Sequence, residues 1–382
     1  MTTQHGAARR SARAALIVAL AVVLAAGGCS AASPHPWQVS AGSPAPGGLG
    51  PRVLHSVSVS GARLIDQDGA PVVLRGVNRS GTQYTCTSGP DTFDGPVDQP
   101  AIEAIRAWGV NAVRVSLNEQ CWLGVNGLPL GRPADAYRRD VADFVRRLTG
   151  AGLAVILDLH WNAPGTVPAS DQQTMADRDH APAFWRSVAA TFTADPAILF
   201  DLYNEPYPDV NKSSDEAWRC VRDGGTCRGV DFVAAGMQEM LDAVRSTGAR
   251  NPVLVAGPQW AGTLDRWVEF RPVDPLDQLV ASLHIYGPPP HTTACADPAC
   301  WDATIAPLAG QVPIVLGEIG TMDCTPGIIP TLTAWADRHG VGYLAWGWVT
   351  SDCAREPALI SDYDGTPTPY GSALRDHLLP QG

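Results

Sequence analysis

The sequence predicts an α/β fold, a (β/α)8 TIM barrel that follows a short N-terminal hairpin. Eight short apolar runs alternate with segments of helical periodicity, and continuous apolar runs are typical of parallel strands buried on both faces. Polar residues gather where the runs stop, which is where the carboxyl-terminal face of a barrel would lie. The eight runs are 72–77, 112–117, 154–159, 198–203, 253–256, 279–285, 314–316 and 342–346.

Amphipathic segments between the runs predict the helices of the barrel. From Pro133 to Gly150 the apolar residues fall on one helix face, and Gly150 stands where a C-cap is expected. An open, doubly wound sheet is the structural alternative, but its first strand would normally lead into a glycine-rich turn. The first run ends in Leu74-Arg75-Gly76-Val77-Asn78, without such a turn. Further helices are expected at 181–193, 231–247, 330–339 and 374–379.

The first 29 residues predict export. An arginine-rich start precedes an apolar run from Ala14 to Ala26, which is too short to span a bilayer comfortably. The tetrapeptide Ala26-Gly27-Gly28-Cys29 resembles a bacterial lipobox, in which the cysteine carries a lipid, although Leu usually stands at the place of Ala26. We therefore expect a signal peptide over 1–29. The mature protein is either released or attached to the outer face of the membrane through a lipid on Cys29.

The segment after the signal peptide predicts a linker and then the barrel domain. Residues 30–55 are rich in Ala, Ser, Pro and Gly, a composition typical of a flexible tether. From Val57 to Val73 alternating residues and a turn at 66–69 predict the hairpin. The barrel domain is therefore expected over 56–382.

Nine cysteines occur in the chain, and setting Cys29 aside leaves eight. An even set in an exported chain indicates disulfides, but many pairings are possible in principle. A zinc site would need tighter spacings such as C-x-x-C, and none occurs. Proximity favours Cys220–Cys227 and Cys295–Cys300 as local pairs, which would leave Cys86–Cys121 and Cys324–Cys353 to join loops after neighbouring strands.

Composition excludes one class of partner. The net charge of −11 argues against a nucleic-acid-binding protein, because such proteins neutralise phosphates with clustered Lys and Arg. A neutral polymer needs no charge steering and is compatible with this acidic balance. The 12 tryptophans are a high count, and their side chains offer flat apolar platforms.

Two glutamates at the ends of the fourth and seventh runs, Glu205 and Glu318, indicate the chemistry. Strands on opposite parts of one ring would point them at each other, and a carboxyl pair suits the cleavage of a glycosidic bond. One carboxyl protonates the leaving oxygen, and the other attacks or stabilises the oxocarbenium-like carbon. A separation of about 5–5.5 Å predicts retention of configuration, whereas about 6.5–9.5 Å predicts inversion.

The ordered motifs resemble glycoside hydrolase family 5, the cellulase family, over most of the chain from Val72 to about Thr350. The resemblance implies that Glu205 is the acid/base and Glu318 the nucleophile of a retaining enzyme that cuts β-linked polysaccharide. The motifs that carry the resemblance are Asn204-Glu205-Pro206, His284-x-Tyr286, Gly317-Glu318 and Trp346.

The same resemblance implies roles for residues around the glutamates. Asn204 would bind the 2-hydroxyl of the sugar under attack, and Tyr286 would donate a hydrogen bond to the nucleophile. Arg114 would lie under the nucleophile and keep it ionised by its opposite charge. His160 and His284 would line the cleavage subsite, and Trp346 would stack on the sugar.

Other aromatic and acidic residues are assigned from their places along the runs. Trp161, Trp260 and Trp122 are candidates for outer sugar subsites, with packing above the barrel as the alternative. Asp158 and Asp201 lie inside strands and are expected to be structural, while Glu119 is a weaker carboxylate candidate beside a disulfide-tied loop. His160, His284 and Asp158 also resemble the ligands of metal-dependent barrel hydrolases, but no His-x-His follows the first run. We therefore expect neither a metal nor an organic cofactor.

These observations together predict an endo-acting β-1,4-glucanase that acts, as a monomer, on a polysaccharide or oligosaccharide. A β-mannanase, or a hydrolase of xyloglucan or short glucosides, remains open because the segments 162–180 and 207–230 are long enough to reshape a cleft. A barrel that binds carbohydrate without cleaving it is the alternative from a different class.

Overall fold

A computed structural model describes residues 53–127, 131–287, 295–353 and 355–379, which belong to one compact unit. The predicted signal peptide, Cys29 and the part of the predicted linker up to residue 52 lie outside the described residues. Within the described ranges, no helix combines the length and the apolar character that a membrane crossing requires.

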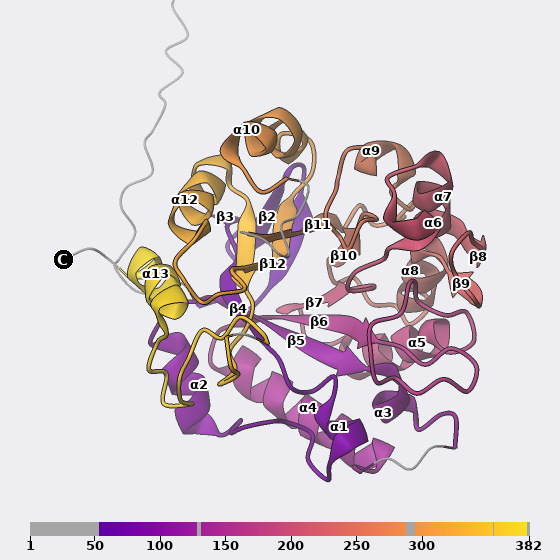
Figure 1. Cartoon of the computed structure of the whole chain (residues 1–382), viewed down its shortest axis with the longest axis horizontal. Coiled ribbons are helices and arrows are strands. Elements are labelled where there is room, and N and C mark those ends of the chain that lie inside the picture. The colour runs from indigo at the N-terminus through magenta and orange to yellow at the C-terminus, as the bar shows by residue number, and fades with distance from the viewer. Residues whose placement is uncertain (1–52, 128–130, 288–294, 354, 380–382) are drawn as a thin grey trace, which may run out of the picture. The chain divides into compact units, whose positions relative to one another are not determined.

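In the described part of the chain, eight parallel strands close into a barrel, which confirms the predicted fold (Figure 1). Strands β5 and β12 are buried along their whole length, as the continuous apolar runs indicated. Around the ring the order is β4, β5, β6, β7, β10, β11, β12 and β13. Their bounds are Arg75–Arg79, Ala112–Asn118, Ala154–Trp161, Ile198–Asp201, Val253–Ala256, Leu279–Tyr286, Ile314–Gly320 and Gly342–Ala345.

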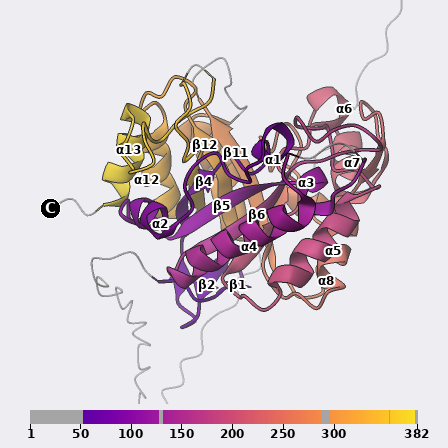
Figure 2. The ribbon, with the colours of Figure 1, turned by 90° about the horizontal axis from the view of Figure 1, so that it is seen from below.

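Helices cover the outside of the barrel, and Figure 2 shows α4 and α5 lying along β5 and β6. Helix α4 buries Tyr137, Val141, Phe144, Val145 and Leu148, the face expected from the sequence. The longer helices are α2 (Gln99–Arg106), α4 (Ala134–Gly150), α5 (Ala181–Phe192), α7 (Asp215–Asp223), α8 (Met237–Arg245), α12 (Ile329–His339) and α13 (Pro369–Leu378). The shorter ones are α1 (Thr85–Ser88), α3 (Glu119–Leu123), α6 (Pro208–Asn211), α9 (Trp267–Phe270), α10 (Pro298–Cys300), a π turn (Trp301–Ile305) and α11 (Ala306–Ala309).

A small antiparallel sheet closes the amino-terminal end of the barrel. It has three strands where a two-stranded hairpin was expected, namely β1 (Val57–Ser60), β2 (Arg63–Asp66) and β3 (Pro71–Val72). Leu54 and Leu64 pack in one cluster with Leu199 and Val315, which lie near the starts of their barrel strands. The first barrel strand starts at Arg75 rather than at residue 72, because Val72 pairs with Leu64 in the small sheet.

The predicted start of the helix expected at 231–247 is wrong. Residues Val233–Ala235 form strand β9, which pairs with β8 (Gly224–Thr226), and helix α8 begins only at Met237. A short Val-Ala-Ala run fits a strand as well as a helix, so periodicity does not separate the two. The hairpin is tied to α7 by the Cys220–Cys227 disulfide.

The four disulfides of the described residues are the four expected pairs, two of them favoured by proximity and two left over after those. Two of them fasten loops at the carboxyl-terminal end of the barrel. One connects α1 to α3, and another connects the segments that follow β12 and β13. The pairs are Cys86–Cys121, Cys220–Cys227, Cys295–Cys300 and Cys324–Cys353.

Candidate active site

The carboxyl-terminal rim of the barrel brings together residues that are far apart in the sequence. Parallel strands in a closed barrel all end on one rim, so the polar residues at their ends become neighbours there. The residues are Arg114 in β5, His160 in β6, Asn204 and Glu205 after β7, His284 and Tyr286 in β11, Glu318 in β12 and Trp346 after β13.

Glu205 and Glu318 both approach the same ring nitrogen of His284. The Nδ1 atom of His284 is 2.9 Å from Glu205 Oε1 and 3.7 Å from Glu318 Oε2. One carboxylate oxygen of each glutamate and one ring nitrogen of His284 all lie within 4.8 Å of one another. The Glu205 side chain is 20% exposed and that of Glu318 only 5%, so Glu205 is the more accessible of the two.

Two donors hold the carboxylate of Glu318. Tyr286 donates its hydroxyl hydrogen to Oε2 over 2.6 Å, and Arg114 Nη1 donates to Oε1 over 2.8 Å. Burial, and then the charge of Glu318, raises the pKa of Tyr286 well above its usual value, so this hydroxyl remains a donor at neutral pH. Gly317 leaves room beside the site, because a Cβ there would come within 3.0 Å of His284 Nε2.

Arg114 is fully buried and contacts four further side chains. Nε donates to Asp201 Oδ2 over 3.0 Å, and Nη2 lies 3.1 Å from Asp158 Oδ1. The remaining hydrogens go to Asn204 Oδ1 at 2.9 Å and Asn78 Oδ1 at 3.0 Å. Burial acts to lower the pKa of Arg114, but the charges of Asp158 and Asp201 outweigh it and raise the pKa, so the guanidinium stays charged.

His160 and Trp346 form a stacked pair next to this network. Their ring centroids are 5.1 Å apart with an interplanar angle of 17°. His160 Nδ1 lies 2.7 Å from Asp158 Oδ2, and Trp346 Nε1 donates to Glu356 Oε1 over 2.7 Å. The polar ends of both rings are thereby fixed, which sets the direction of the flat Trp346 face.

The outer tryptophans fall into two groups. Trp260 is 37% exposed and stacks on Tyr207, with centroids 3.7 Å apart, while Trp161 is half-buried with its ring centroid 6.3 Å from that of Tyr84. Trp122 is wrong as a candidate subsite, because it is fully buried and its indole nitrogen donates to a hydroxyl of α5. An amphipathic aromatic after a strand fits a core and a surface platform equally well, so the sequence did not separate them.

Sequence reasoning missed two residues that lie at the site. Glu356 accepts hydrogen bonds from Trp346 and from Ser80 Oγ, and Gln172 accepts one from Asn204 Nδ2. Both belong to irregular segments that show no periodicity and no motif, so no sequence signal marked them.

A family model described as "Cellulase (glycosyl hydrolase family 5)" matches residues 65–352. The chain belongs to this family. It is 27% identical over 253 residues to Endoglucanase C of Evansella cellulosilytica, a match that covers 61% of the chain and 26% of that relative. It is 26% identical over 301 residues to the mannan endo-1,4-beta-mannosidase of Streptomyces lividans, covering 76% of the chain and 66% of that relative. The chain thus spans only about a quarter of the first of these relatives.

Solved structures share the fold of this family 5 chain. The beta-glucanase of Saccharophagus degradans in complex with cellotetraose superposes with a TM-score of 0.66 at 20% identity, covering 86% of this chain and 94% of that one. The beta-mannanase of Streptomyces thermolilacinus with mannohexaose gives a TM-score of 0.58 at 23% identity, covering 84% and 92%.

In this family 5 chain, the pKa values of the neighbouring Glu205 and His284 are shifted in opposite directions. Burial raises the pKa of Glu205 to about 7, so its carboxyl holds a proton over much of the neutral range. Burial lowers the pKa of His284 to about 4, so the imidazole beside it is neutral and does not compete as a cation. Glu205 can therefore donate a proton, while the Glu318 carboxyl group accepts hydrogen bonds from Arg114 and Tyr286.

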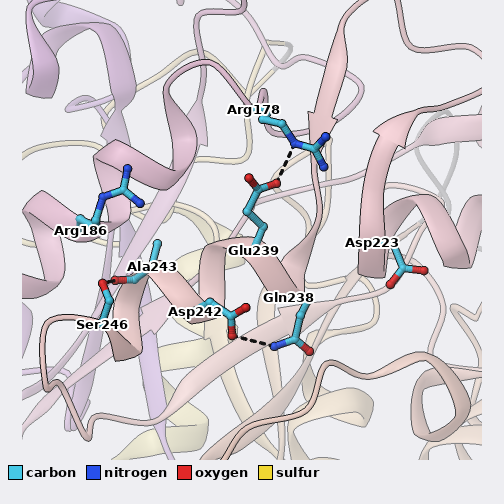
Figure 3. Close-up of a pocket in the computed structure, with 8 residues that line it drawn as sticks. All are labelled: Arg178, Arg186, Asp223, Gln238, Glu239, Asp242, Ala243 and Ser246. Atoms are coloured by element: carbon cyan, nitrogen blue, oxygen red, sulfur yellow. Dashed lines mark hydrogen bonds and ion pairs between the residues drawn. The ribbon is translucent and has the colours of Figure 1, made fainter.

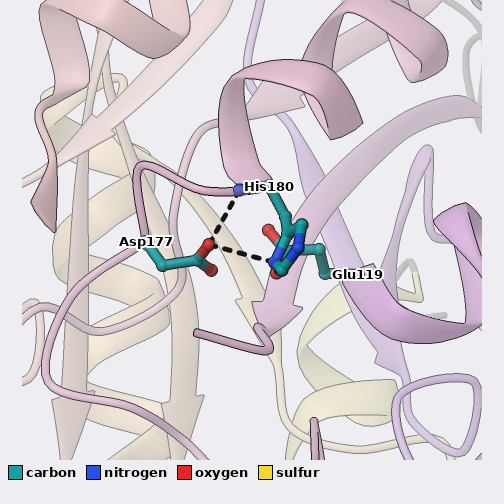
Figure 4. Close-up of side chains that lie close together, drawn as sticks. All are labelled: Glu119, Asp177 and His180. Atoms are coloured by element: carbon teal, nitrogen blue, oxygen red, sulfur yellow. Dashed lines mark hydrogen bonds and ion pairs between the residues drawn. The ribbon is translucent and has the colours of Figure 1, made fainter. Parts of the chain in front are cut away.

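A second acidic cluster lies outside this site and could in principle hold a metal ion. Glu119, Asp177 and His180 each bring a ligand atom within 4.8 Å of the others (Figure 4). His180 Nδ1, however, lies 2.9 Å from the carbonyl oxygen of Ala163, to which a protonated Nδ1 donates. Burial, and then the charge of Asp177, raises the pKa of Glu119 well above its usual value. A proton on Glu119 therefore removes one of the two negative charges of the Glu119–Asp177 pair.

Replacing Glu119 by Gln should leave the free energy of unfolding within about 1 kcal/mol of wild type, since an amide supplies the hydrogen that the carboxyl supplies to Asp177. Glu119→Ala should cost about 1–3 kcal/mol, because Ala163 N loses its acceptor and Asp177 its neighbour. Urea unfolding with and without EDTA measures both. Chelator-sensitive stability in wild type, together with a large loss in Glu119→Gln, would instead show that a cation binds there.

A hollow on the outside of the barrel is lined by residues in or near α5 and α8, together with Asp223 (Figure 3). Its lining residues Arg178 and Glu239 form an ion pair of 2.8 Å. None of the lining residues is aromatic or belongs to the strand ends that carry Glu205 and Glu318. A hollow lined by side chains of both charges and by no aromatic ring offers no flat apolar surface on which a sugar could stack.

Proposed function

We propose that the protein is a retaining, endo-acting hydrolase of β-1,4-linked glycans, with a glucan as the preferred substrate. The observation that carries this proposal is the Glu205–His284–Glu318 arrangement, in which an oxygen of each carboxyl group lies within 4.8 Å of the other. This separation is close to the value of about 5–5.5 Å typical of retaining enzymes and is shorter than the value of about 6.5–9.5 Å typical of inverting enzymes.

In the first step of the proposed reaction, Glu318 attacks the anomeric carbon while Glu205 protonates the leaving oxygen. The glycosidic C–O bond breaks, a covalent glycosyl–Glu318 ester forms, and the Glu205 proton leaves with the aglycone alcohol. Arg114 and Tyr286 hold the attacking carboxylate in position through their hydrogen bonds until its oxygen forms the ester bond.

In the second step, Glu205 acts as a base. It takes a proton from a water molecule, whose oxygen attacks the anomeric carbon and releases Glu318 as a carboxylate. Asn204 is placed to donate from Nδ2 to the sugar 2-hydroxyl in both steps, because Arg114 fixes its Oδ1 atom on the other side. Two inversions give a product with the configuration of the substrate.

The relatives include endoglucanases as well as mannanases, and we take a glucan as the first candidate because the family model is described as a cellulase. β-Mannan is the second candidate, because the Streptomyces lividans mannosidase is matched over a larger share of both chains than Endoglucanase C. Reducing-sugar release from cellulose, barley glucan, mannan and xyloglucan, with detection of the first-formed anomer, tests both. An α-anomer as first product would overturn the retaining mechanism.

The activity should fall as pH rises through about 7, because catalysis begins with a protonated Glu205. Above this pKa the protonated fraction drops about tenfold per pH unit, and kcat/KM should drop with it. A profile of kcat/KM on a soluble oligosaccharide measures this basic limb. In Glu205→Ala, tested on an aryl glycoside with an activated leaving group, the limb should vanish, and its persistence would assign it to another group.

Trp260 should contribute a subsite on the leaving-group side. Its backbone nitrogen donates to the carbonyl oxygen of Pro206, the residue after Glu205, so the exposed Trp260–Tyr207 stack lies close to the acid in sequence and in space. Trp260→Ala should lower kcat/KM on polymer about three- to tenfold, the value of one aromatic stacking contact, and leave short aryl glycosides unaffected. Val273→Ala, at a residue 78% exposed, serves as control. Equal losses on both substrates would contradict the subsite.

We also propose that the protein is exported. Four disulfides in the described residues support an oxidising destination. Expression of the full chain and of Cys29→Ser, followed by fractionation of membranes and medium, separates an anchored from a released protein. Retention of both forms in the cytoplasm would overturn export.

A further inference from the structure

We infer that Gln172 is a positioning residue for this reaction, a loop side chain that orients the Asn204 amide and fixes the peptide that carries Glu205. The inference rests on the proposed function, because it assigns Gln172 to the same site. Gln172 is half-buried and lies in the β6–α5 loop, defined here as residues 162–180.

Gln172 contacts three consecutive residues with one side chain. Its Oε1 atom accepts a hydrogen bond from Asn204 Nδ2 over 3.0 Å. Its Nε2 atom, which carries two hydrogens, has three acceptors within reach: the carbonyl oxygen of Gln173 at 2.9 Å, Tyr203 Oη at 3.0 Å and the carbonyl oxygen of Glu205 at 3.3 Å. The amide therefore connects the residue before the sugar-binding Asn204, Asn204 itself and the acid/base.

Arg114 and Gln172 together determine which way the Asn204 amide points. Arg114 has only donors, so its 2.9 Å contact must be with Asn204 Oδ1, and the nitrogen is then turned toward Gln172 Oε1. One hydrogen of Asn204 Nδ2 is used by Gln172. The other hydrogen has only a long contact, 3.5 Å to His160 Nε2, which a sugar hydroxyl can replace.

The loop that carries Gln172 is itself held in place. The Tyr203 hydroxyl lies within hydrogen-bond distance of two acceptors in the loop, Asn162 Oδ1 at 2.9 Å and the Gln173 carbonyl oxygen at 2.7 Å. Asn162 Nδ2 donates to Asp177 Oδ2 over 2.9 Å, which connects the loop to the acidic cluster of Glu119. A side chain on so tightly bonded a loop can hold Asn204 in a fixed direction before substrate arrives.

The chemistry of the contacts requires an amide. Gln accepts from Asn204 through its oxygen and donates to Glu205 and Tyr203 through its nitrogen. A glutamate at position 172 would keep the acceptor, lose the donor and add a negative charge near Glu205. Gln172→Glu should therefore move the basic limb of the pH profile upward, because a nearby anion raises the pKa of a carboxyl group.

The test compares Gln172→Ala, Gln172→Glu, Asn204→Ala and the double variant Gln172→Ala/Asn204→Ala on the 4-nitrophenyl β-bioside that wild type cleaves. Gln172→Ala should lower kcat about ten- to hundredfold with little change in KM, since it misorients a group that acts in the transition state. In the Asn204→Ala background, adding Gln172→Ala should lower kcat by less than about threefold, because the two residues act together. Gln173→Ala on the same loop is the matched control and should match wild type.

Three results would overturn the inference. Wild-type rates in Gln172→Ala, full multiplicative losses in the double variant, or an unmoved pH profile in Gln172→Glu would each show that Gln172 does not act through its neighbours. If Gln172→Ala fails to fold by thermal unfolding, the near-isosteric Gln172→Glu carries the decision. Wild type without activity on any bioside or polymer would overturn the proposed function as well, whereas an active wild type with these results removes only the role of Gln172.

Discussion

Glu318→Gln should lower turnover by at least about 10³-fold, because an amide cannot form the glycosyl ester and the loss of a nucleophile is not replaced by the remaining groups. Gln has the shape of Glu and its oxygen can still accept from Tyr286 or Arg114, so the fold should persist. Initial rates on a soluble oligosaccharide and a thermal unfolding curve measure the two effects.

Glu119→Gln is the matched control, since it makes the same change in a buried carboxyl outside the site. Its turnover should equal that of wild type. Calorimetric binding of an oligosaccharide to Glu318→Gln then separates an enzyme from a barrel that only binds carbohydrate. Retained binding with lost turnover supports the nucleophile, and an unchanged rate would refute the assignment of Glu318.

Arg114→Met should lower the free energy of unfolding by about 3–5 kcal/mol, because removing one partner from a buried ionic cluster leaves the other charges uncompensated. Arg114 contacts Asp158, Asp201 and Glu318, and its side chain and those of both aspartates are 0% exposed. Turnover should fall as well, because Glu318 loses one of its two donors. Urea unfolding and initial rates measure these losses.

Arg139→Met offers a comparison on the surface, where Arg139 pairs with Asp135 on helix α4 and both side chains are more than half exposed. Such pairs contribute about 0–1 kcal/mol, so this variant should unfold almost like wild type. If Arg114→Met lowered the free energy of unfolding no more than Arg139→Met does, Arg114 would not be needed to compensate the buried carboxylates around it.

The barrel and the residues on its rim were predictable because each depends on local pattern. A strand buried on both faces must be apolar, as β5 and β12 are, so the residue where such a run stops marks the rim. Glu205 and Glu318 stand at those points. The direction of each side chain did not follow from the pattern, and it came only from the structure.

What the sequence did not reveal depends on contacts between distant segments. Gln172 reaches Asn204 from a loop without periodicity, and Glu119 meets Asp177 across an interval that no spacing rule links. Trp122 was placed wrongly because burial is decided by the helices α4 and α5 that pack against it. Strand β9 was read as helix because its pairing partner lies in another short segment.

The sheet of β1–β3 covers the barrel at the end opposite the glutamates, and Leu54, just before β1, packs into the same apolar cluster. The described chain therefore starts, at residue 53, on the barrel face away from Glu205 and Glu318, which leaves the opposite rim free for a long polymer at the proposed site.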